Sequence, residues 1–177
     1  MSQKMRGFTL IELLIVVAIV GILAALLIPN AIQAIQKAKQ TGTMKDIAVI
    51  SGAIADYVVD NGVAPAQDGT YVAASTFYGA VSPLYLKVLP LTDQWAENFR
   101  IYCGTAVDGN YGISGAGSDD FVVCSYGRDK TLETFTFDAN NPEAGLFAIT
   151  SMSDFDNDLV MWNGSWIRGR RGASVGS

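Results

Sequence analysis

The hydrophobic pattern divides the chain into an apolar run, an amphipathic segment and a mixed C-terminal part. From Phe8 to Ile28 every residue is apolar or small except Thr9 and Glu12. At about 1.5 Å per helical residue this run is roughly 31 Å long, which matches the hydrocarbon core of a bilayer. We therefore expect residues 8–28 to form a hydrophobic, membrane-spanning half of a helix.

Residues 29–60 predict the second, amphipathic half of the same helix. Their apolar residues recur at intervals of three and four, as in Ile47, Ile50 and Ile54. This spacing is typical of a helix with one face packed on a domain.

Three positions set the expected shape and end of this helix. Pro29 lacks an N–H and crowds the preceding turn, and Gly42 has low helix propensity. We expect a helix that is bent or partly unwound near both residues. It should end around Asp60–Gly62, where the glycine is able to take a left-handed conformation.

Residues 61–177 predict a globular headpiece. A short helix is expected around 75–86 and a second one at 142–151. Short β-branched and aromatic runs, separated by Gly, Asn and Asp, predict antiparallel strands; they are Phe99–Tyr102, Phe121–Val123, Phe135–Phe137 and Leu159–Trp162. The predicted fold class is α+β, in which a small antiparallel β-sheet lies on the amphipathic half of the long helix.

Charge and composition exclude several functions. The formal net charge is −5, which argues against sequence-independent nucleic-acid binding. The chain has no histidine and two cysteines, too few for an all-thiolate zinc site, so we do not expect an enzyme. The basic cluster at 168–172 predicts a flexible tail over residues 168–177, with contact to lipid headgroups, an acidic subunit or DNA as the alternatives.

Glu12 is the unusual residue of the apolar run. An ionised carboxylate inside a membrane helix costs on the order of 3 kcal/mol, so it needs a partner or a function. A secretory signal peptide would explain Lys4 and Arg6, but its apolar core is shorter, and such a core contains no acid. A plain single-pass anchor leaves both Glu12 and the Gly7–Phe8 junction unexplained.

The segment GFTLIELLIVVAIVGILAALLIP resembles the N-terminus of the type IV pilin superfamily, which includes the pseudopilins of type II secretion. The resemblance implies that residues 1–7 are a leader and that a prepilin peptidase cleaves between Gly7 and Phe8 and methylates the new Phe8 amine. It also implies that Glu12 pairs with this amine in a neighbouring subunit. We assign Glu12 and Pro29 to filament assembly.

Most of the remaining chain is similar to the major pseudopilin of type II secretion. Two segments carry this likeness before the C-terminal loop; their matching residues are Tyr57, Asp60, Asn61, Gly62 and Pro65, then Leu89, Pro90, Asp93, Trp95, Asn98 and Phe99. The resemblance implies a structural subunit of a helical filament, a homo-oligomer that drives protein secretion. The alternative is a major pilin of a surface fibre for adhesion, twitching motility or DNA uptake.

The resemblance also implies partners and a location. Besides the prepilin peptidase, the partners are an inner-membrane assembly platform, minor pilins or pseudopilins, and membrane lipid before assembly. The location is the bacterial inner membrane, with a single span and a periplasmic headpiece, or the cell exterior for a surface fibre. A membrane-anchored binding module or enzyme is the alternative from another class, and it requires a convergent polar pocket.

Export would place the cysteines in an oxidising compartment. Cys103 and Cys124 then either form a disulfide or remain as two buried free thiols. We expect the disulfide.

The resemblance finally implies a bound Ca²⁺. The family's late loop runs through a tyrosine, an S-x-G-x-D segment and a D-x-D followed by an apolar residue and a tryptophan. The ligands that carry over are the Ile113 carbonyl, Ser114, Asp119, Asp156 and Asp158. This chain departs from the pattern by an extra residue between Ser114 and Asp119, by Gln94 in place of a proline, and by a long insertion before Asp156. Solvated turn aspartates are the alternative to a metal site.

Overall fold

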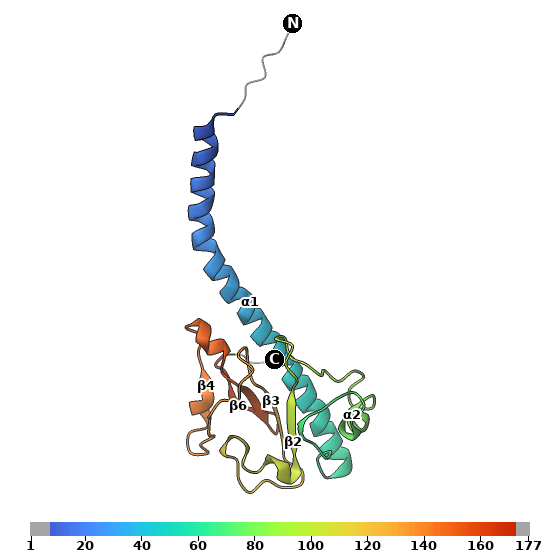
Figure 1. Ribbon diagram of the computed structural model, residues 1–177. Helices are drawn as coiled ribbons and strands as arrows, with labels where there is room; N and C mark the ends of the chain where they lie inside the picture. The colour runs from blue at the N-terminus through green and yellow to red at the C-terminus, as the bar shows by residue number, and fades with distance from the viewer. Residues whose placement is uncertain (1–7, 173–177) are drawn as a thin grey trace. The chain divides into compact units, whose positions relative to one another are not determined.

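The computed structural model describes residues 8–172, and the chain divides into two compact units, residues 1–36 and 37–177. Helix α1, Leu10–Asn61, contributes residues to both units, and each unit is described by itself (Figure 1). The α+β fold class is confirmed, because a long N-terminal helix precedes a headpiece that contains a β-sheet.

Helix α1 is continuous through Pro29 and Gly42. The predicted local unwinding at these two residues is therefore wrong. The side chain of Asn30 donates a hydrogen bond to the carbonyl of Leu26 at 3.2 Å, in the turn where the proline supplies no N–H. The predicted end is confirmed, because the N–H of Gly62 bonds to Val58 O at 2.8 Å and Gly62 has φ +74°.

The second half of α1 buries one face in the headpiece. The buried positions recur at the helical period; they are Gln40, Thr43, Met44, Ile47, Ile50, Ser51, Ala53 and Ile54. Three of them, Ile47, Ile50 and Ile54, are the residues whose spacing predicted an amphipathic helix.

Within residues 8–172 the headpiece contains a six-stranded sheet with the order β1-β2-β3-β5-β6-β4. The strands are β1 Asp68–Thr70, β2 Arg100–Cys103, β3 Phe121–Ser125, β4 Leu146–Phe147, β5 Leu159–Trp162 and β6 Ser165–Arg170. Neighbouring strands are antiparallel except β4 and β6, which are parallel. The expected purely antiparallel sheet is thus mixed at one edge.

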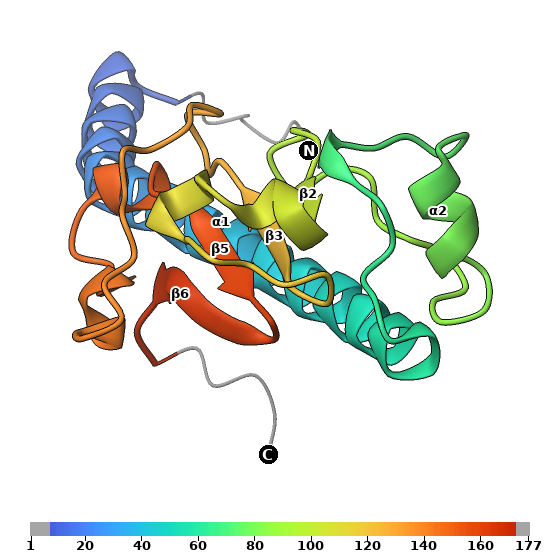
Figure 2. The ribbon, with the colours of Figure 1, turned by 90° about the horizontal axis from the view of Figure 1, so that it is seen from below.

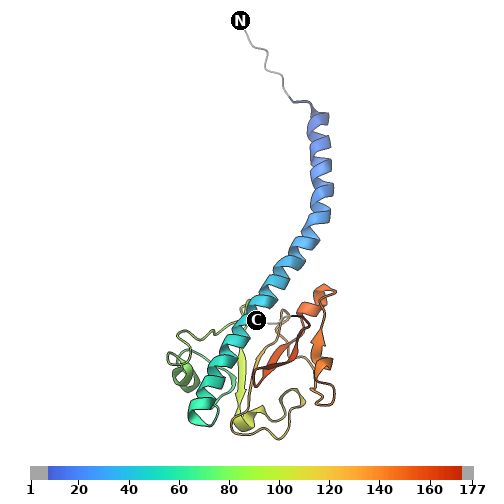
Figure 3. The ribbon, with the colours of Figure 1, turned by 180° about the vertical axis from the view of Figure 1, so that it is seen from behind.

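The central strand β3 is buried on both faces. Val123 packs with the α1 face of the core, together with Ile101 and Met161. Val122 and Cys124 face the opposite way, into a second cluster that contains Tyr111 and residues from loops. Figures 2 and 3 show the sheet against the second half of α1, with α2, Thr76–Val81, beside the last turns of that helix.

The predicted strands at Phe99–Tyr102, Phe121–Val123 and Leu159–Trp162 are confirmed as β2, β3 and β5. The strand predicted at Phe135–Phe137 is wrong, because this segment is a loop. Its aromatic side chains cover the sheet, and its backbone is not part of it. The rings of Phe137 and Trp162 pack edge to face with their centroids 5.6 Å apart. Alternating apolar residues indicate one buried side, and a loop on a sheet face satisfies that pattern too.

The region 142–151 is also not the predicted helix. It contains a 3₁₀ turn, Pro142–Gly145, followed by β4. Leu146 and Phe147 pair with Gly169 and Arg170 of β6, so their backbone is extended and a helix is unable to continue through them. Arg168 adds a hydrogen bond to the carbonyl of Gly145 at 3.2 Å.

Arg168 anchors the long segment between β3 and β5. Its side chain, 13% exposed, forms an ion pair with Glu133 and lies over the rings of Phe135 and Phe147. The prediction of a flexible tail from residue 168 is therefore wrong for residues 168–170, which complete β6. Residues 173–177 lie outside the described part.

We predict that two isoleucine substitutions in α1 have different effects on headpiece stability, because one side chain is buried in the headpiece core and the other is exposed. Ile50→Ala removes a fully buried side chain and should lower the free energy of unfolding of the headpiece by about 2 to 5 kcal/mol. Ile35→Ala changes a side chain that is 56% exposed and should leave headpiece melting unchanged. Thermal unfolding of the full chain in detergent micelles measures both, and equal losses would contradict the packing described here.

Candidate functional site

The first turn of α1 holds Glu12 in a reciprocal capping arrangement. The backbone N–H and hydroxyl of Thr9 donate to Glu12 Oε2 at 2.8 and 2.7 Å. The N–H of Glu12 donates in return to the Thr9 hydroxyl at 3.3 Å. Two of the N–H groups that a helix leaves unpaired at its start are thereby satisfied.

This capping box fixes the Glu12 carboxylate at the N-terminal end of the helix. A negative charge is favourable there, because the helix dipole places partial positive charge at this end. Phe8, 84% exposed, directly precedes the box. Gly7, the residue before the predicted cleavage point, lies outside the described residues.

Thr9 is a functional residue beyond those predicted from the sequence. The signal was present, because a threonine followed three residues later by a glutamate, ahead of an apolar run, is the sequence pattern of a capping box. The structure makes Thr9 the partner of Glu12 within the subunit.

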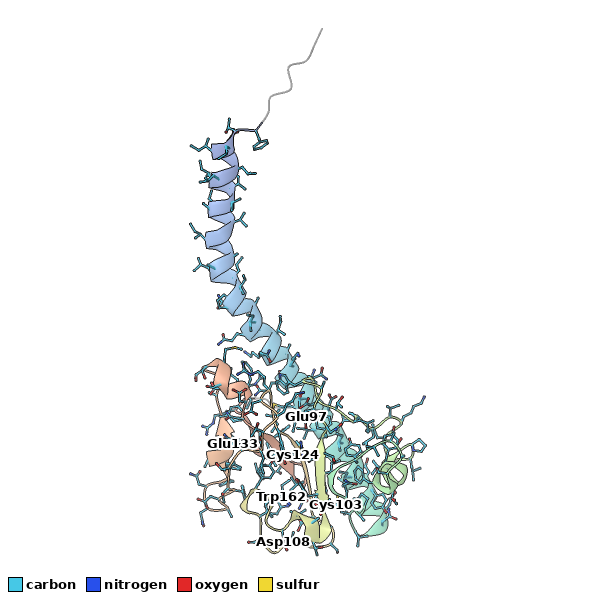
Figure 4. The ribbon with its side chains drawn as sticks, viewed as in Figure 1. Glu97, Cys103, Asp108, Cys124, Glu133 and Trp162 are labelled. Carbon is cyan, nitrogen blue, oxygen red and sulfur yellow. The ribbon has the colours of Figure 1, made fainter. Side chains whose placement is uncertain are left out.

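The first half of α1 presents an apolar surface that nothing in its own unit covers. In Figure 4 its side chains project outward on all sides of the helix. The exposed large side chains include Leu10, Ile11, Leu13, Leu14, Ile15, Val16, Val17, Ile19, Val20, Ile22, Leu23, Leu26, Leu27, Ile28, Ile32 and Ile35. This helix is long and apolar enough to cross a membrane. We call the exposed apolar positions from Phe8 to Ile35 the apolar surface.

The two cysteines are free and buried, so the predicted disulfide is wrong. Cys103 and Cys124 lie on neighbouring strands but at opposite ends of the ladder, since Cys103 pairs with Phe121 and Cys124 with Arg100. That offset is about 10 Å along the strands, beyond the reach of a disulfide. The side chains also lie on opposite faces of the sheet, and Figure 4 labels them at separate positions.

The structure does not bring the five residues proposed for Ca²⁺ together. Asp119 precedes the first residue of β3, whereas Asp156 and Asp158 precede β5, whose start pairs with the last residue of β3. These ends are about 13 Å apart along the strand, while the oxygen ligands of one Ca²⁺ lie within roughly 5 Å of each other. Ile113 and Ser114 belong to the Asp119 side, where the Ile113 carbonyl accepts a hydrogen bond from Gly109 at 2.9 Å.

A second segment matches the family's S-x-G-x-D spacing without an extra residue. It is Ser125-Tyr126-Gly127-Arg128-Asp129, which follows β3 and therefore lies at the same end of the sheet as Asp156 and Asp158. The N–H of Arg128 bonds to Phe155 O at 2.9 Å, so the two segments are in direct contact. The S-x-G-x-D spacing thus occurs without an insertion at residues 125–129 and with one extra residue at residues 114–119.

Asp158 is the buried acid of this region. Its Oδ2 accepts hydrogen bonds from the hydroxyl of Tyr111 at 2.8 Å and the N–H of Glu133 at 3.2 Å. Burial raises the pKa of this carboxyl group to about 6. Within residues 8–172 no group of three or more acidic or cysteine side chains is placed to hold a metal ion.

Comparison with known proteins agrees with the N-terminal features. Residues 2–28 match the prokaryotic N-terminal methylation motif. The chain is 33% identical to type II secretion system core protein G of Vibrio cholerae, over 81% of this chain and 86% of that protein. It is 34% identical to the protein of the same name from Dickeya chrysanthemi, over 92% and 90%. Fimbrial protein EcpC of Eikenella corrodens is 37% identical over 45% and 52%. No solved structure matches the chain significantly.

We predict that both thiols of the native protein are unreactive. Burial raises the pKa of Cys103 and of Cys124 to about 12, so neither forms the nucleophilic thiolate at pH 8. Alkylation followed by mass spectrometry should modify neither cysteine in the folded chain and both after denaturation without reductant. A Ser114→Cys variant, which adds a thiol at an exposed position, should react in the folded state as a control. Unmodified cysteines after denaturation would indicate a disulfide and contradict the structure.

Proposed function

Because the chain belongs to the family of type II secretion system core protein G, the major pseudopilins of the type IV pilin superfamily, we propose that it is the repeating subunit of a type II secretion pseudopilus. The chain is a structural subunit that works by polymerising and not by catalysis. Matches over 81% and 92% of its length carry this assignment. The apolar surface supplies the physical reason for polymerisation.

The apolar surface needs a cover in every state of the protein. An α-helix satisfies its backbone hydrogen bonds internally, so the same helix is stable in lipid and among other helices. Before assembly, lipid covers the apolar surface and anchors the chain in the membrane. In the filament, the helices of neighbouring copies replace the lipid.

Glu12 selects the position of the neighbouring copy. Cleavage after Gly7 creates a cationic amine on Phe8, and methylation leaves that charge in place. In an apolar filament core, this amine and the Glu12 carboxylate of the adjacent subunit attract strongly, and an unpaired carboxylate is penalised. The capping box holds the carboxylate at the helix start before the partner arrives.

The remaining partners and the location follow from this role. A prepilin peptidase processes the leader, as the match to the methylation motif supports. An inner-membrane assembly platform adds subunits, and minor pseudopilins initiate the filament or form its tip. The headpiece lies in the periplasm.

A surface fibre is the alternative that the sequence left open. The match to fimbrial protein EcpC covers 45% of this chain, whereas the core protein G matches extend through the headpiece. The longer matches to core protein G therefore favour secretion.

We predict that the charge of Glu12, and not its capping bond alone, is needed for assembly. Glu12→Gln keeps a side chain that suits a capping box but removes the charge, and Glu12→Ala removes both. Both variants should enter the membrane like the parent. Filament yield should fall at least about tenfold in both, because a hydrogen bond to a charged group contributes about 1.5 to 3 kcal/mol.

Thr9→Val is the matched control, because it removes the capping hydroxyl and leaves the carboxylate. It should cost about 1 kcal/mol of helix stability and retain most of the filament yield. Membrane fractionation and quantification of sheared or cross-linked filaments provide the readouts. Normal filaments from Glu12→Gln, or an equal loss in Thr9→Val, would refute the charge-pairing role.

A further inference from the structure

Two segments from distant parts of the sequence form a charged cluster at one end of the sheet. Residues 126–133 follow β3 and residues 154–158 precede β5, and the pairing of Ser125 with Leu159 brings them together. We call the side chains that gather here the turn cluster; they are Arg128, Asp129, Glu133, Asp156 and Asp158.

Arg128 joins the two segments of the turn cluster through Asp156. Its Nε donates to Asp156 Oδ1 at 2.7 Å and its Nη2 donates to Asp156 Oδ2 at 2.8 Å. Both carboxylate oxygens are therefore engaged by one guanidinium group in a parallel, two-bond geometry, which combines charge attraction with directional hydrogen bonds. The side chains are 32% and 28% exposed, so solvent screens the pair only in part.

The backbone is shaped to bring Arg128 to this position. Gly127 has φ +69°, and a Cβ atom placed on it would lie 2.7 to 3.0 Å from the carbonyl oxygens of residues 155, 156 and 157. A residue with a side chain would thus push the two segments apart. With glycine, the N–H of Arg128 reaches Phe155 O at 2.9 Å, and the guanidinium reaches the next residue.

The other acids of the turn cluster also have partners within the chain. Glu133 is paired with Arg168, with Nε to Oε2 at 2.9 Å. Asp129 Oδ1 accepts a hydrogen bond from the N–H of Thr131 at 3.0 Å, and Asp158 Oδ2 accepts from Tyr111. Asp158 Oδ1 is the one carboxylate oxygen of the turn cluster that is buried without a hydrogen-bond partner in the described part of the chain. One such oxygen is too few for Ca²⁺, which takes six to eight oxygen ligands.

The residues present therefore do not fit a bound Ca²⁺, in the earlier ligand set or in the turn cluster. We infer that Arg128 is a built-in counterion that takes the place of a divalent cation between the two segments, so that the headpiece folds independently of Ca²⁺. The guanidinium supplies the positive charge, and its covalent attachment makes the turn insensitive to the surrounding metal concentration. This inference concerns the stability of the headpiece and goes beyond the proposed function.

The first test measures the melting temperature of the full chain in detergent micelles with excess CaCl₂, with excess MgCl₂ and with EDTA. A cation bound only by the folded state at a hundredfold excess over its dissociation constant would raise the melting temperature by several degrees. We expect the three values to agree within about 1 °C. A clear increase with CaCl₂ alone would overturn the inference.

The second test removes the counterion. Arg128→Gln should lower the melting temperature by about 3 to 6 °C, because Asp156 loses both hydrogen bonds and its charge partner. Arg171→Gln is the matched control, since Arg171 and Glu143 form a longer ion pair of 3.8 Å that is mostly exposed, and it should change little. Equal effects of the two variants would overturn the inference.

The third test separates charge from packing. The double variant Arg128→Gln/Asp156→Asn replaces the ion pair by two neutral amides and should recover most of the loss in Arg128→Gln. Failure to recover would show that Arg128 acts through packing and not as a counterion.

Discussion

An apolar helix surface without a cover inside its own subunit is the constraint from which the properties of this protein follow. The backbone of α1 is satisfied by its own hydrogen bonds, but the apolar surface from Phe8 to Ile35 is not stable in water. Lipid and other copies of the same helix are both suitable covers. An acid at the start of such a helix is costly unless it has a partner, and the capping box with Thr9 provides one within the subunit. A partner in the filament would compete for the same carboxylate.

In the headpiece, ion pairs hold loops onto the sheet. Strand β3 is buried on both faces, and one of these faces is covered by loops instead of a helix. Loops need anchors, and two arginines provide them. Arg168 holds the inserted segment through Glu133 and the carbonyl of Gly145, and Arg128 ties the segment after β3 to Asp156. Both arginines link parts of the chain that are far apart in sequence.

Periodicity predicted the elements whose burial is one-sided or complete, namely α1 and strands β2, β3 and β5. It failed at Phe135–Phe137, because a loop lying on a sheet has the same alternation as a strand. The disulfide prediction was wrong because two cysteines on neighbouring strands meet only if the strand register and the sheet face of each side chain allow it. Neither property is visible from the spacing of the cysteines in the sequence. Thr9 and Glu12 have the spacing of a capping box, and residues 125–129 have the S-x-G-x-D spacing, so both motifs are visible in the sequence. The departure at Gln94 has a structural reason, because its backbone N–H donates to Thr43 at 3.2 Å, which a proline is unable to do.

The central claim is that processing at the tip of α1 creates the cation that Glu12 meets in the neighbouring subunit. Mass spectrometry of the N-terminal peptide of protein purified from its own cells tests this most directly. The account predicts a chain that begins with N-methylated Phe8. A filament-forming protein that retains residues 1–7 would contradict it, because no amine would then stand next to the capping box.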